Sequence, residues 1–357
     1  MAANTLLLSD LSFQKIEELV NSLGVSAYRV KQLTHWLYRE LALSFDEMTD
    51  LPKPFRENLA KRAHLHCLTL TRKLVSRDGT IKVLFTLEDG NTIESVLMPY
   101  LETEGKTRYT LCVSTQVGCP IKCAFCATGQ QGFERNLSPG EIIDQVLYFA
   151  RKLRDEEEGN VITNLVFMGM GEPLANYDNV WQAIVMLNSP DGFTLGARNI
   201  TVSTSGLIPG IKRLSQEKIQ VNLAVSLHAS KNSLRNLLVP INNKYPLEQL
   251  IPACRDYITA SGRRVSFEYI LFEGINDSLV QARSLAHLVA GLNCHVNLIV
   301  ANKTAGSEYC SPSAETVTAF DQELKRLRIT CTVRQSRGVD IDAGCGQLRS
   351  RHTKRIL

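Results

Sequence analysis

The sequence predicts an α/β protein: an open, incomplete (β/α)6 barrel that follows a small helical domain and an antiparallel β-ribbon. Beyond Thr110, short β-rich runs alternate with helical stretches over about 230 residues, a pattern typical of parallel strands joined by crossover helices. About six such units fit into this length, too few for a closed eight-fold barrel. A chain of 357 residues with 44% hydrophobic and 21% charged residues is long enough for one large core and an accessory domain.

The N-terminal part changes its hydrophobic period once. Within residues 1–66, SDLSFQKIEELVNSL and AYRVKQLTHWLYREL repeat apolar residues at three- and four-residue intervals, which predicts a helical accessory domain. In residues 67–104 the period becomes two, and Asp-Gly pairs ending at Gly79 and Gly90 mark hairpin turns. We therefore expect an antiparallel ribbon there.

The predicted barrel occupies residues 105–345. Ser138 and Glu141, on either side of Pro139 and a glycine, form a capping box that predicts the start of one of its helices. Functional residues of such a fold belong at the carboxyl ends of the parallel strands. The strand candidates are TLCVSTQ, NLVFMG, NITVST, VNLAVSLH, VSFEYILF, HVNLIVA and TCTVRQ.

Composition indicates a cytoplasmic protein. Ten cysteines without a secretory start favour a reducing compartment, and no run approaches the roughly 18 apolar residues that a membrane helix needs. The net charge of +4 is mild. The segment 346–357, however, carries four basic residues and no acid, so it either contacts a phosphate backbone or is a solvated tail.

Three cysteines in the stretch GCPIKCAFCATG form the most informative motif. Cys119, Cys123 and Cys126 have a C-x3-C-x2-C spacing on a loop directly after the first predicted barrel strand. Three thiolates can hold a cubane iron–sulfur cluster and leave its fourth iron open, whereas structural zinc takes four protein ligands. The alternatives are three buried thiols, or a zinc site completed by a distant cysteine or histidine.

This spacing resembles the radical S-adenosylmethionine superfamily, and further segments are similar to one of its branches. That branch is the RlmN family, bacterial dual-specificity methyltransferases that act on C2 of an adenine in 23S rRNA and in some tRNAs. The resemblance covers nearly the whole chain. Its segments are LCVSTQVGCPIKCAFCATGQQGFERNLSPGEI, VFMGMGEPLANYDNV, STSGLIPGI, LAVSLHAS with VPINNKYPL, RRVSFEYILFEGINDS and VDIDAGCGQL.

The resemblance implies three catalytic residues. Cys345 matches the cysteine that is methylated first and then presents its methyl group to the base. Cys112 matches the cysteine that releases the product by forming a disulfide with Cys345. Glu94 matches the general base that removes the C2 proton. The radical is needed because adenine C2 has no lone pair with which to attack a methyl donor.

The resemblance also implies the cofactors and partners. A [4Fe-4S] cluster is expected on Cys119, Cys123 and Cys126, with two molecules of S-adenosylmethionine used per methylation. The partners are 23S rRNA, tRNA and an electron donor such as flavodoxin with its reductase, and the protein is expected to be a monomer without membrane contact. The residues matching S-adenosylmethionine contacts are Gly171, Glu172, Ser203, Ser226, Leu227, His228 and Asn302.

Two other functions remain open on sequence grounds. The sister family that methylates C8 of the same adenine, and so confers antibiotic resistance, shares the thiols, although FERNLSPGEI and VDIDAGCGQL look more like the C2 branch. A non-catalytic iron–sulfur or zinc RNA-binding protein is the alternative outside the enzymes.

Overall fold

A ten-stranded mixed sheet forms the centre of the protein in the computed structural model, which describes residues 5–101, 107–156, 160–302 and 309–348. Its strand order is β14-β13-β12-β11-β10-β9-β6-β5-β4-β3. Seven consecutive members of this sheet run parallel, as the sequence predicts. They are β6 (Thr107–Cys112), β9 (Ile162–Phe167), β10 (Ile200–Thr204), β11 (Asn222–Ser226), β12 (Val265–Leu271), β13 (Cys294–Val300) and β14 (Cys331–Arg334).

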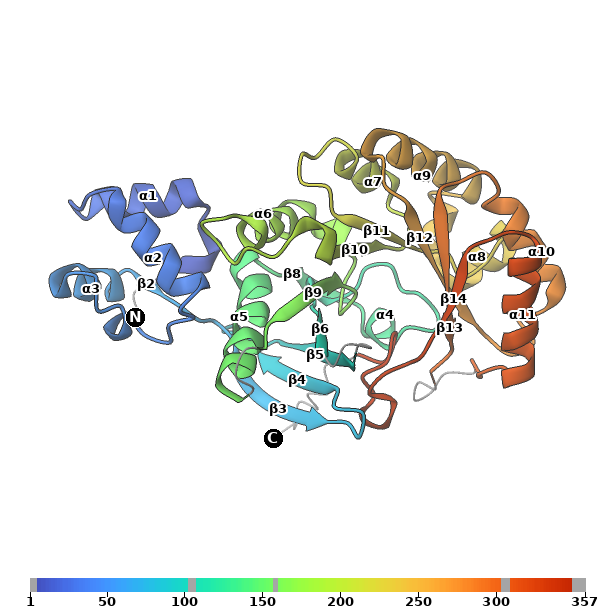
Figure 1. Cartoon of the computed structure of the whole chain (residues 1–357), viewed down its shortest axis with the longest axis horizontal. Helices are drawn as coiled ribbons and strands as arrows, with labels where there is room; N and C mark the ends of the chain where they lie inside the picture. The colour runs from blue at the N-terminus through green and yellow to red at the C-terminus, as the bar shows by residue number, and fades with distance from the viewer. Residues whose placement is uncertain (1–4, 102–106, 157–159, 303–308, 349–357) are drawn as a thin grey trace.

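Helices connect the parallel strands and form an arc around them (Figure 1). Six βα units precede the last strand, and β14 and β3 lie at opposite ends of the strand order. Within the described residues the barrel is therefore open, and the predicted fold class is confirmed. The helices are α4 (Ala127–Gln131), α5 (Pro139–Glu156), α6 (Tyr177–Asn188), α7 (Ile208–Leu214), α8 (Asn232–Leu238), α9 (Leu247–Ser261), α10 (Leu279–Leu288) and α11 (Ala314–Arg326).

The capping box predicted for the helix that follows the cysteine loop is present at the start of α5. The Ser138 Oγ accepts the Glu141 N–H, and the Glu141 carboxylate accepts the Ser138 N–H at 2.9 Å. Each side chain thus satisfies a backbone donor that the first helical turn leaves free.

The N-terminal segment is helical and packs on the barrel. It contains α1 (Phe13–Ser22), α2 (Tyr28–Tyr38) and α3 (Lys53–Ala60), with a short parallel pair between β1 (Leu6–Leu7) and β2 (Ala63–His64). These helices lie at the end of the molecule opposite β12–β14 (Figure 1). The Asp10 carboxylate accepts the Gly140 N–H of α5 at 2.6 Å, and the Asp10 carbonyl accepts Gln182 of α6 at 2.8 Å.

The predicted ribbon consists of β3 (Thr69–Val75), β4 (Ile81–Thr86) and β5 (Thr92–Leu101). Both predicted Asp-Gly turns are present, and in each the glycine has a φ near +80°. Because β5 pairs antiparallel with β6, the ribbon extends the main sheet. The division of the chain into four segments stays a prediction.

Two further expectations concern the membrane and the basic tail. Among the described residues, no helix is both long and apolar enough to cross a bilayer. The basic residues expected to contact RNA from the tail, Arg349, Arg351, Lys354 and Arg355, lie outside the described residues.

Candidate active site

The cysteine loop follows β6 after a short connecting segment. Between them lies β7 (Gln116–Gly118), which pairs with β8 (Phe133–Asn136) and closes the loop at its base. Gly118 has a φ of +74°, and a Cβ built on it would lie 2.0 Å from the Gly132 carbonyl oxygen. Only glycine fits this crossing, so the residue before Cys119 is fixed by backbone packing.

The three motif cysteines line one cavity of about 140 Å³. Burial raises the pKa of Cys119 to about 12 and raises the pKa of Cys123 well above its usual value, and the neighbouring thiols add to both shifts. Three mutually repelling thiolates in a half-buried site need a cation to be stable together. The residues therefore fit a thiolate-bound metal cluster.

A single metal ion and a cubane cluster require different arrangements of the ligand side chains. In the described residues, no three His, Cys, Asp or Glu side chains converge on a point that one metal ion could occupy. A cubane requires no such point, because each thiolate binds a different iron atom.

The carboxyl ends of the parallel strands form the opposite wall of this cavity. Gly171, Ser203, Ser226 and His228 line it, each at or just after the end of a strand. Glu172 lies there too, buried, and its carboxylate accepts the N–H and the hydroxyl of Ser205, both at 2.7 Å. Burial raises the Glu172 pKa, although the Ser205 hydrogen bonds favour the carboxylate.

His228 has an unusual backbone at this wall. Its φ is +58°, a left-handed conformation that is strained for a residue with a side chain. The Nδ1 atom accepts the Ile270 N–H at 3.1 Å, and burial, followed by the charge of Arg235, lowers the pKa to about 3. The imidazole is therefore neutral, with its proton on Nε2.

Arg235 of α8 is fully buried below the same wall. Its guanidinium donates to the carbonyl oxygens of Ser205, Ser226 and Leu227 at 2.7–3.1 Å, and to the Asn242 amide oxygen at 2.8 Å. These carbonyls come from the ends of β10 and β11. One side chain therefore holds together two strand ends that line the cavity.

The loop that carries Cys345 is held on two sides. The Ala127 N–H donates to the Gly346 carbonyl at 2.8 Å, and the Thr128 hydroxyl donates to the Leu348 carbonyl at 2.6 Å, which ties the loop to α4. From the ribbon, the Lys82 ammonium donates to the Asp342 carbonyl at 2.9 Å. The far end of the chain is thus brought to the cysteine loop.

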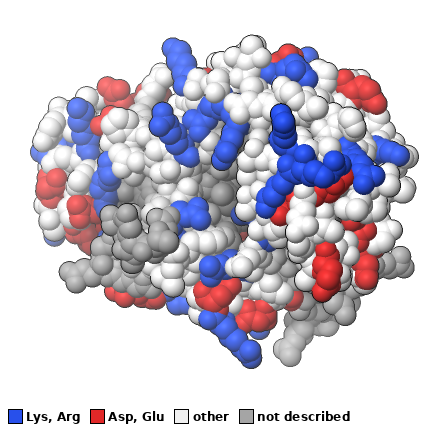
Figure 2. Space-filling view, turned by 45° about the vertical axis from the view of Figure 1, so that its right-hand side comes forward, with Lys and Arg blue, Asp and Glu red and all other residues white. Residues whose placement is uncertain are grey.

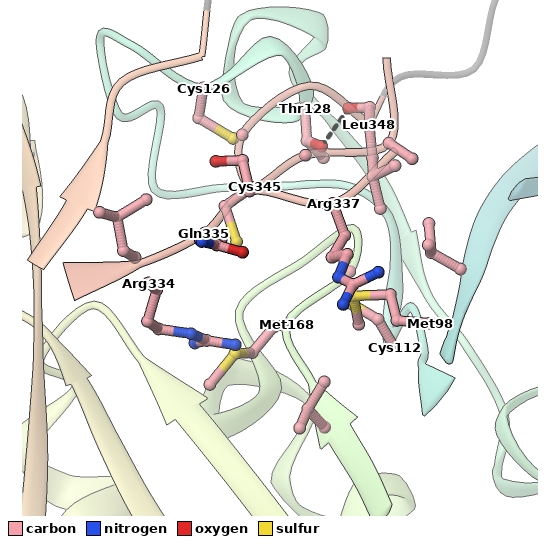
Figure 3. Close-up of a pocket in the computed structure, with 18 of the residues that line it drawn as sticks. Met98, Cys112, Cys126, Thr128, Met168, Arg334, Gln335, Arg337, Cys345 and Leu348 are labelled. Carbon is pink, nitrogen blue, oxygen red and sulfur yellow. Dashed lines mark hydrogen bonds between the residues drawn. The ribbon is translucent and has the colours of Figure 1, made fainter. Parts of the chain in front are cut away.

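Cys345 lies where two cavities meet. It lines the first cavity with the three motif cysteines, and it also lines a second cavity of about 100 Å³ with Cys126 and Cys112 (Figure 3). Arg334, at the end of β14, lines both. The structure therefore brings together all five cysteines that the sequence singles out.

Other predicted residues lie beside these cavities. Glu94 is buried in a neighbouring cavity, where its carboxylate forms an ion pair with Lys82 at 3.3 Å. The Leu227 side chain is buried in the core. Asn302 packs against Gly344, and its buried Nδ2 has no hydrogen-bond partner among the described residues. Asn302 thus places a buried, unsatisfied amide donor beside Gly344, the residue before Cys345. A ligand could accept a hydrogen bond from this donor.

The sequence patterns did not identify three residues of the site: Arg235, Glu268 and Arg334. Glu268 is buried in β12, accepts the Asn297 amide at 2.7 Å, and lies 3.4 Å from Arg334. An acid inside the apolar strand VSFEYILF was the available signal, because a charge in a buried strand needs a partner or a function.

Comparison with known proteins assigns the family. Residues 6–65 match the family described as "Ribosomal RNA large subunit methyltransferase N-terminal domain", and residues 113–286 match the radical SAM superfamily. A relative from Moorella thermoacetica, named "Probable dual-specificity RNA methyltransferase RlmN", is 48% identical over 94% of this chain and 95% of its own. The chain belongs to the RlmN family.

Further relatives agree with this assignment. A Staphylococcus aureus protein with the same name is 46% identical over 96% of this chain and 92% of its own. The crystal structure of a radical SAM methyltransferase from Sphaerobacter thermophilus superimposes with a TM-score of 0.92, at 50% identity, over 96% of this chain and 99% of that one. The radical SAM family implies S-adenosylmethionine and a [4Fe-4S] cluster, which the motif cysteines suit.

Proposed function

We propose that the protein methylates C2 of an adenine in 23S rRNA, and an adenine of some tRNAs, by way of a methylated Cys345. The observation that supports this most strongly is the position of Cys345, which lines both the cavity of the three motif cysteines and the cavity of Cys112. The names of the relatives, dual-specificity RNA methyltransferases, support RNA as the substrate.

In this proposal Cys119, Cys123 and Cys126 hold the [4Fe-4S] cluster, and the strand-end residues on the opposite wall bind S-adenosylmethionine. When bound, these groups supply a methyl group and a 5′-deoxyadenosyl radical, with two S-adenosylmethionine molecules used per product. Glu172 is suited to the cofactor's ammonium group, because its carboxylate is already oriented by Ser205. Asn302 offers, beside the Cys345 loop, an amide donor that has no hydrogen-bond partner among the described residues.

Cys345 carries the methyl group that is transferred to the base. Its sulfur must face both the cofactor and the RNA, and its loop meets that demand because α4 and the ribbon hold it where the two cavities join. Gly344 is required at this point, because a Cβ there would lie 2.5 Å from the Asn302 Nδ2 atom and 2.7 Å from the Gln347 Oε1 atom.

Cys112 releases the product. Before this step the adduct must lose the C2 proton to the base and one electron to an acceptor, for which the oxidised cluster would be suited. The Cys112 thiolate then attacks the Cys345 sulfur, and the sulfur–carbon bond breaks with its electron pair moving to the carbon that becomes the methyl group. That carbon takes up a proton, and a Cys112–Cys345 disulfide remains. Reduction of this disulfide by two electrons from outside the protein restores both thiols. An electron donor such as flavodoxin with its reductase is proposed to reduce the cluster.

Glu94 is proposed as the base that removes the C2 proton. It lies on the same face of β5 as Val96 and Met98, which line the cavity that contains Cys112 and Cys345. A base must come within hydrogen-bond reach of the proton it removes. Because Glu94 is paired with Lys82 in the adjoining cavity, it would act once the substrate draws its carboxylate toward C2.

Nucleoside analysis tests the reaction. Iron-reconstituted protein, incubated anaerobically with S-adenosylmethionine, a reductant and a fragment of 23S rRNA, is expected to produce 2-methyladenosine. Mass spectrometry that finds only 8-methyladenosine would assign the protein to the C8-methylating reaction instead. A colourless protein with one tightly bound zinc and no cleavage of S-adenosylmethionine would favour a non-catalytic RNA-binding role.

Two cysteine variants test the assigned roles. Cys345→Ala is expected to abolish RNA methylation, because no sulfur remains to carry the methyl group. Cys112→Ala is expected to accumulate RNA covalently attached to Cys345, which a denaturing gel detects as a protein–RNA band. Cys254→Ala is the control, because Cys254 is a buried thiol of α9 that lines neither cavity. Normal turnover in either test variant would contradict the assignment.

The proposal also includes that the enzyme is cytoplasmic and monomeric.

A further inference from the structure

A third cavity, of about 660 Å³, lies on the inner face of the sheet toward the amino ends of the parallel strands. This cavity is called the chamber below. Side chains two or four residues apart on a strand point to the same face of the sheet, and such pairs connect the chamber to the active site. On β10, Thr201 lines this chamber and Ser203 lines the cofactor cavity; on β11, Asn222 lines the chamber and Ser226 lines the cofactor cavity. The chamber and the active site thus occupy successive levels of one concave surface.

The chamber is strongly basic. Among the described residues, five arginines and one acid line it, and this acid, Glu268, is already paired with Arg334. Two of the arginines, Arg198 and Arg264, are exposed and form no ion pair with any described residue. On one face of the molecule, Lys and Arg side chains predominate on both sides of a hollow (Figure 2). The five arginines of the chamber are Arg108, Arg198, Arg264, Arg334 and Arg337.

The chamber lies directly against the cavity that contains Cys112 and Cys345. Six residues line both spaces, so the wall between them is a single layer of side chains. The Tyr100 ring lies at this junction, with the guanidinium of Arg108 4.7 Å from its centroid and that of Arg337 4.8 Å away. The shared residues are Tyr100, Val166, Met168, Arg334, Gln335 and Arg337.

We propose that this chamber binds the phosphate backbone of the substrate RNA next to the target adenine, and so presents the base to the adjacent cavity of Cys345. The inference rests on the proposed function, which requires an adenine to leave its stack and enter the protein. Unpaired arginines bind phosphate oxygens through two parallel N–H groups, and a positive groove beside an aromatic ring is the usual way to follow a single strand. Arg198 and Arg264 are the residues available for phosphate.

The double variant Arg198→Gln/Arg264→Gln tests this in the full-length, iron-reconstituted protein with an RNA hairpin that carries the target adenine in its loop. We expect RNA affinity to fall at least about tenfold, and the slope of log affinity against log salt to decrease by about 1 to 2, because two phosphate contacts are lost. KM for the hairpin should rise while kcat changes little. Methylation of Cys345 without RNA, followed by peptide mass, should be unchanged.

Two further variants make the test specific. Arg255→Gln removes an exposed arginine of α9 that does not line the chamber, and should leave RNA affinity unchanged. Arg198→Lys/Arg264→Lys keeps both charges and should retain most of the affinity. Unchanged affinity and salt slope in the Gln double variant, or an equal loss in Arg255→Gln, would overturn the inference.

The results that would reject the chamber proposal differ from the results that would reject the proposed function. If wild-type protein forms no 2-methyladenosine but the Gln double variant still loses RNA affinity, the chamber binds RNA and the proposed reaction fails. If wild-type protein methylates C2 and the double variant binds RNA normally, the reaction stands and the chamber proposal fails.

Discussion

At the scale of single residues, Arg334 places a positive charge near Cys112 and Cys345, the two thiols of the proposed reaction. Burial raises the pKa of Cys112 to about 12, and the neighbouring Cys345 adds to this shift. Desolvation by the surrounding protein atoms also raises the pKa of Cys345, although its side chain is exposed at the cavity surface. The Arg334 guanidinium lowers both pKa values, because a cation favours a nearby thiolate. Since only the thiolate is nucleophilic, Arg334 assists each proposed sulfur step.

Arg334→Gln should therefore slow methylation of Cys345. Removing the cation raises the thiol pKa, so less thiolate is present at a given pH, and the pH–rate profile should shift to more alkaline pH. The measurement is the methylated fraction of the Cys345 peptide after incubation of iron-loaded protein with S-adenosylmethionine, without RNA, from neutral to alkaline pH. Arg334→Lys keeps the charge and should restore the profile; an unshifted profile in the Gln variant would refute this role.

At the scale of elements, Asp144 of α5 fixes the segment that joins the N-terminal helices to the ribbon. Its buried carboxylate accepts the N–H groups of Cys67 and Leu68 at 2.9 and 3.2 Å, and lies 2.9 Å from the His66 ring and 3.5 Å from Arg151. Burial alone would raise its pKa, but His66, the Cys67 N–H and Arg151 lower it below its usual value.

Asp144→Asn should lower the free energy of unfolding by about 3 kcal/mol at neutral pH, because an amide cannot replace a buried carboxylate that accepts several donors. The folded-state pKa is depressed, so the wild-type advantage is present above about pH 4 and is lost as pH falls through the folded pKa. Urea unfolding at several pH values measures this difference.

The control is Asp155→Asn, on an exposed part of the same helix, which should lower the free energy of unfolding by less than about 1 kcal/mol. A constant difference between wild type and Asp144→Asn down to the lowest pH would exclude the linkage.

The elements themselves were largely predictable, because local patterns determine them. The change of period from 3.6 to 2, the Asp-Gly turns and the Ser138–Glu141 capping box depend on residues close in sequence, and each is present. The clustering of strand-end residues also followed, because parallel strands end on one side of a sheet.

The contacts between distant segments were not predictable in this way. In the sequence, Arg235 is one more charged residue on a short helix. Only the fold shows that its guanidinium donates hydrogen bonds to carbonyl oxygens at the ends of β10 and β11. Glu94 was assigned by resemblance, and its pairing with Lys82 depends on the register of β4 and β5. Long-range partners of this kind depend on tertiary packing, which no local pattern encodes.

At the scale of the whole molecule, the N-terminal helices and the barrel share one apolar core. Buried residues of α1 and α2, such as Ile16 and Leu33, belong to the same contiguous cluster as Leu223 and Phe267 of the central strands. Asp10 adds polar contacts to α5 and α6. Removing the N-terminal helices would expose part of this core, so their stability should be coupled to that of the barrel.

The two tryptophans of the sequence allow this coupling to be measured, because Trp36 lies in α2 and Trp181 in α6. Trp181→Phe leaves a fluorescent reporter only in the N-terminal helices, and Trp36→Phe leaves one only in the barrel. In each variant the urea midpoint from fluorescence should coincide with the midpoint from far-ultraviolet circular dichroism, because a shared core unfolds as one unit. If Trp36 fluorescence changes at clearly lower urea than the circular dichroism signal, the N-terminal helices unfold independently. The packing at Asp10 would then be too weak to couple the two parts, and the helices would be free to move during RNA binding.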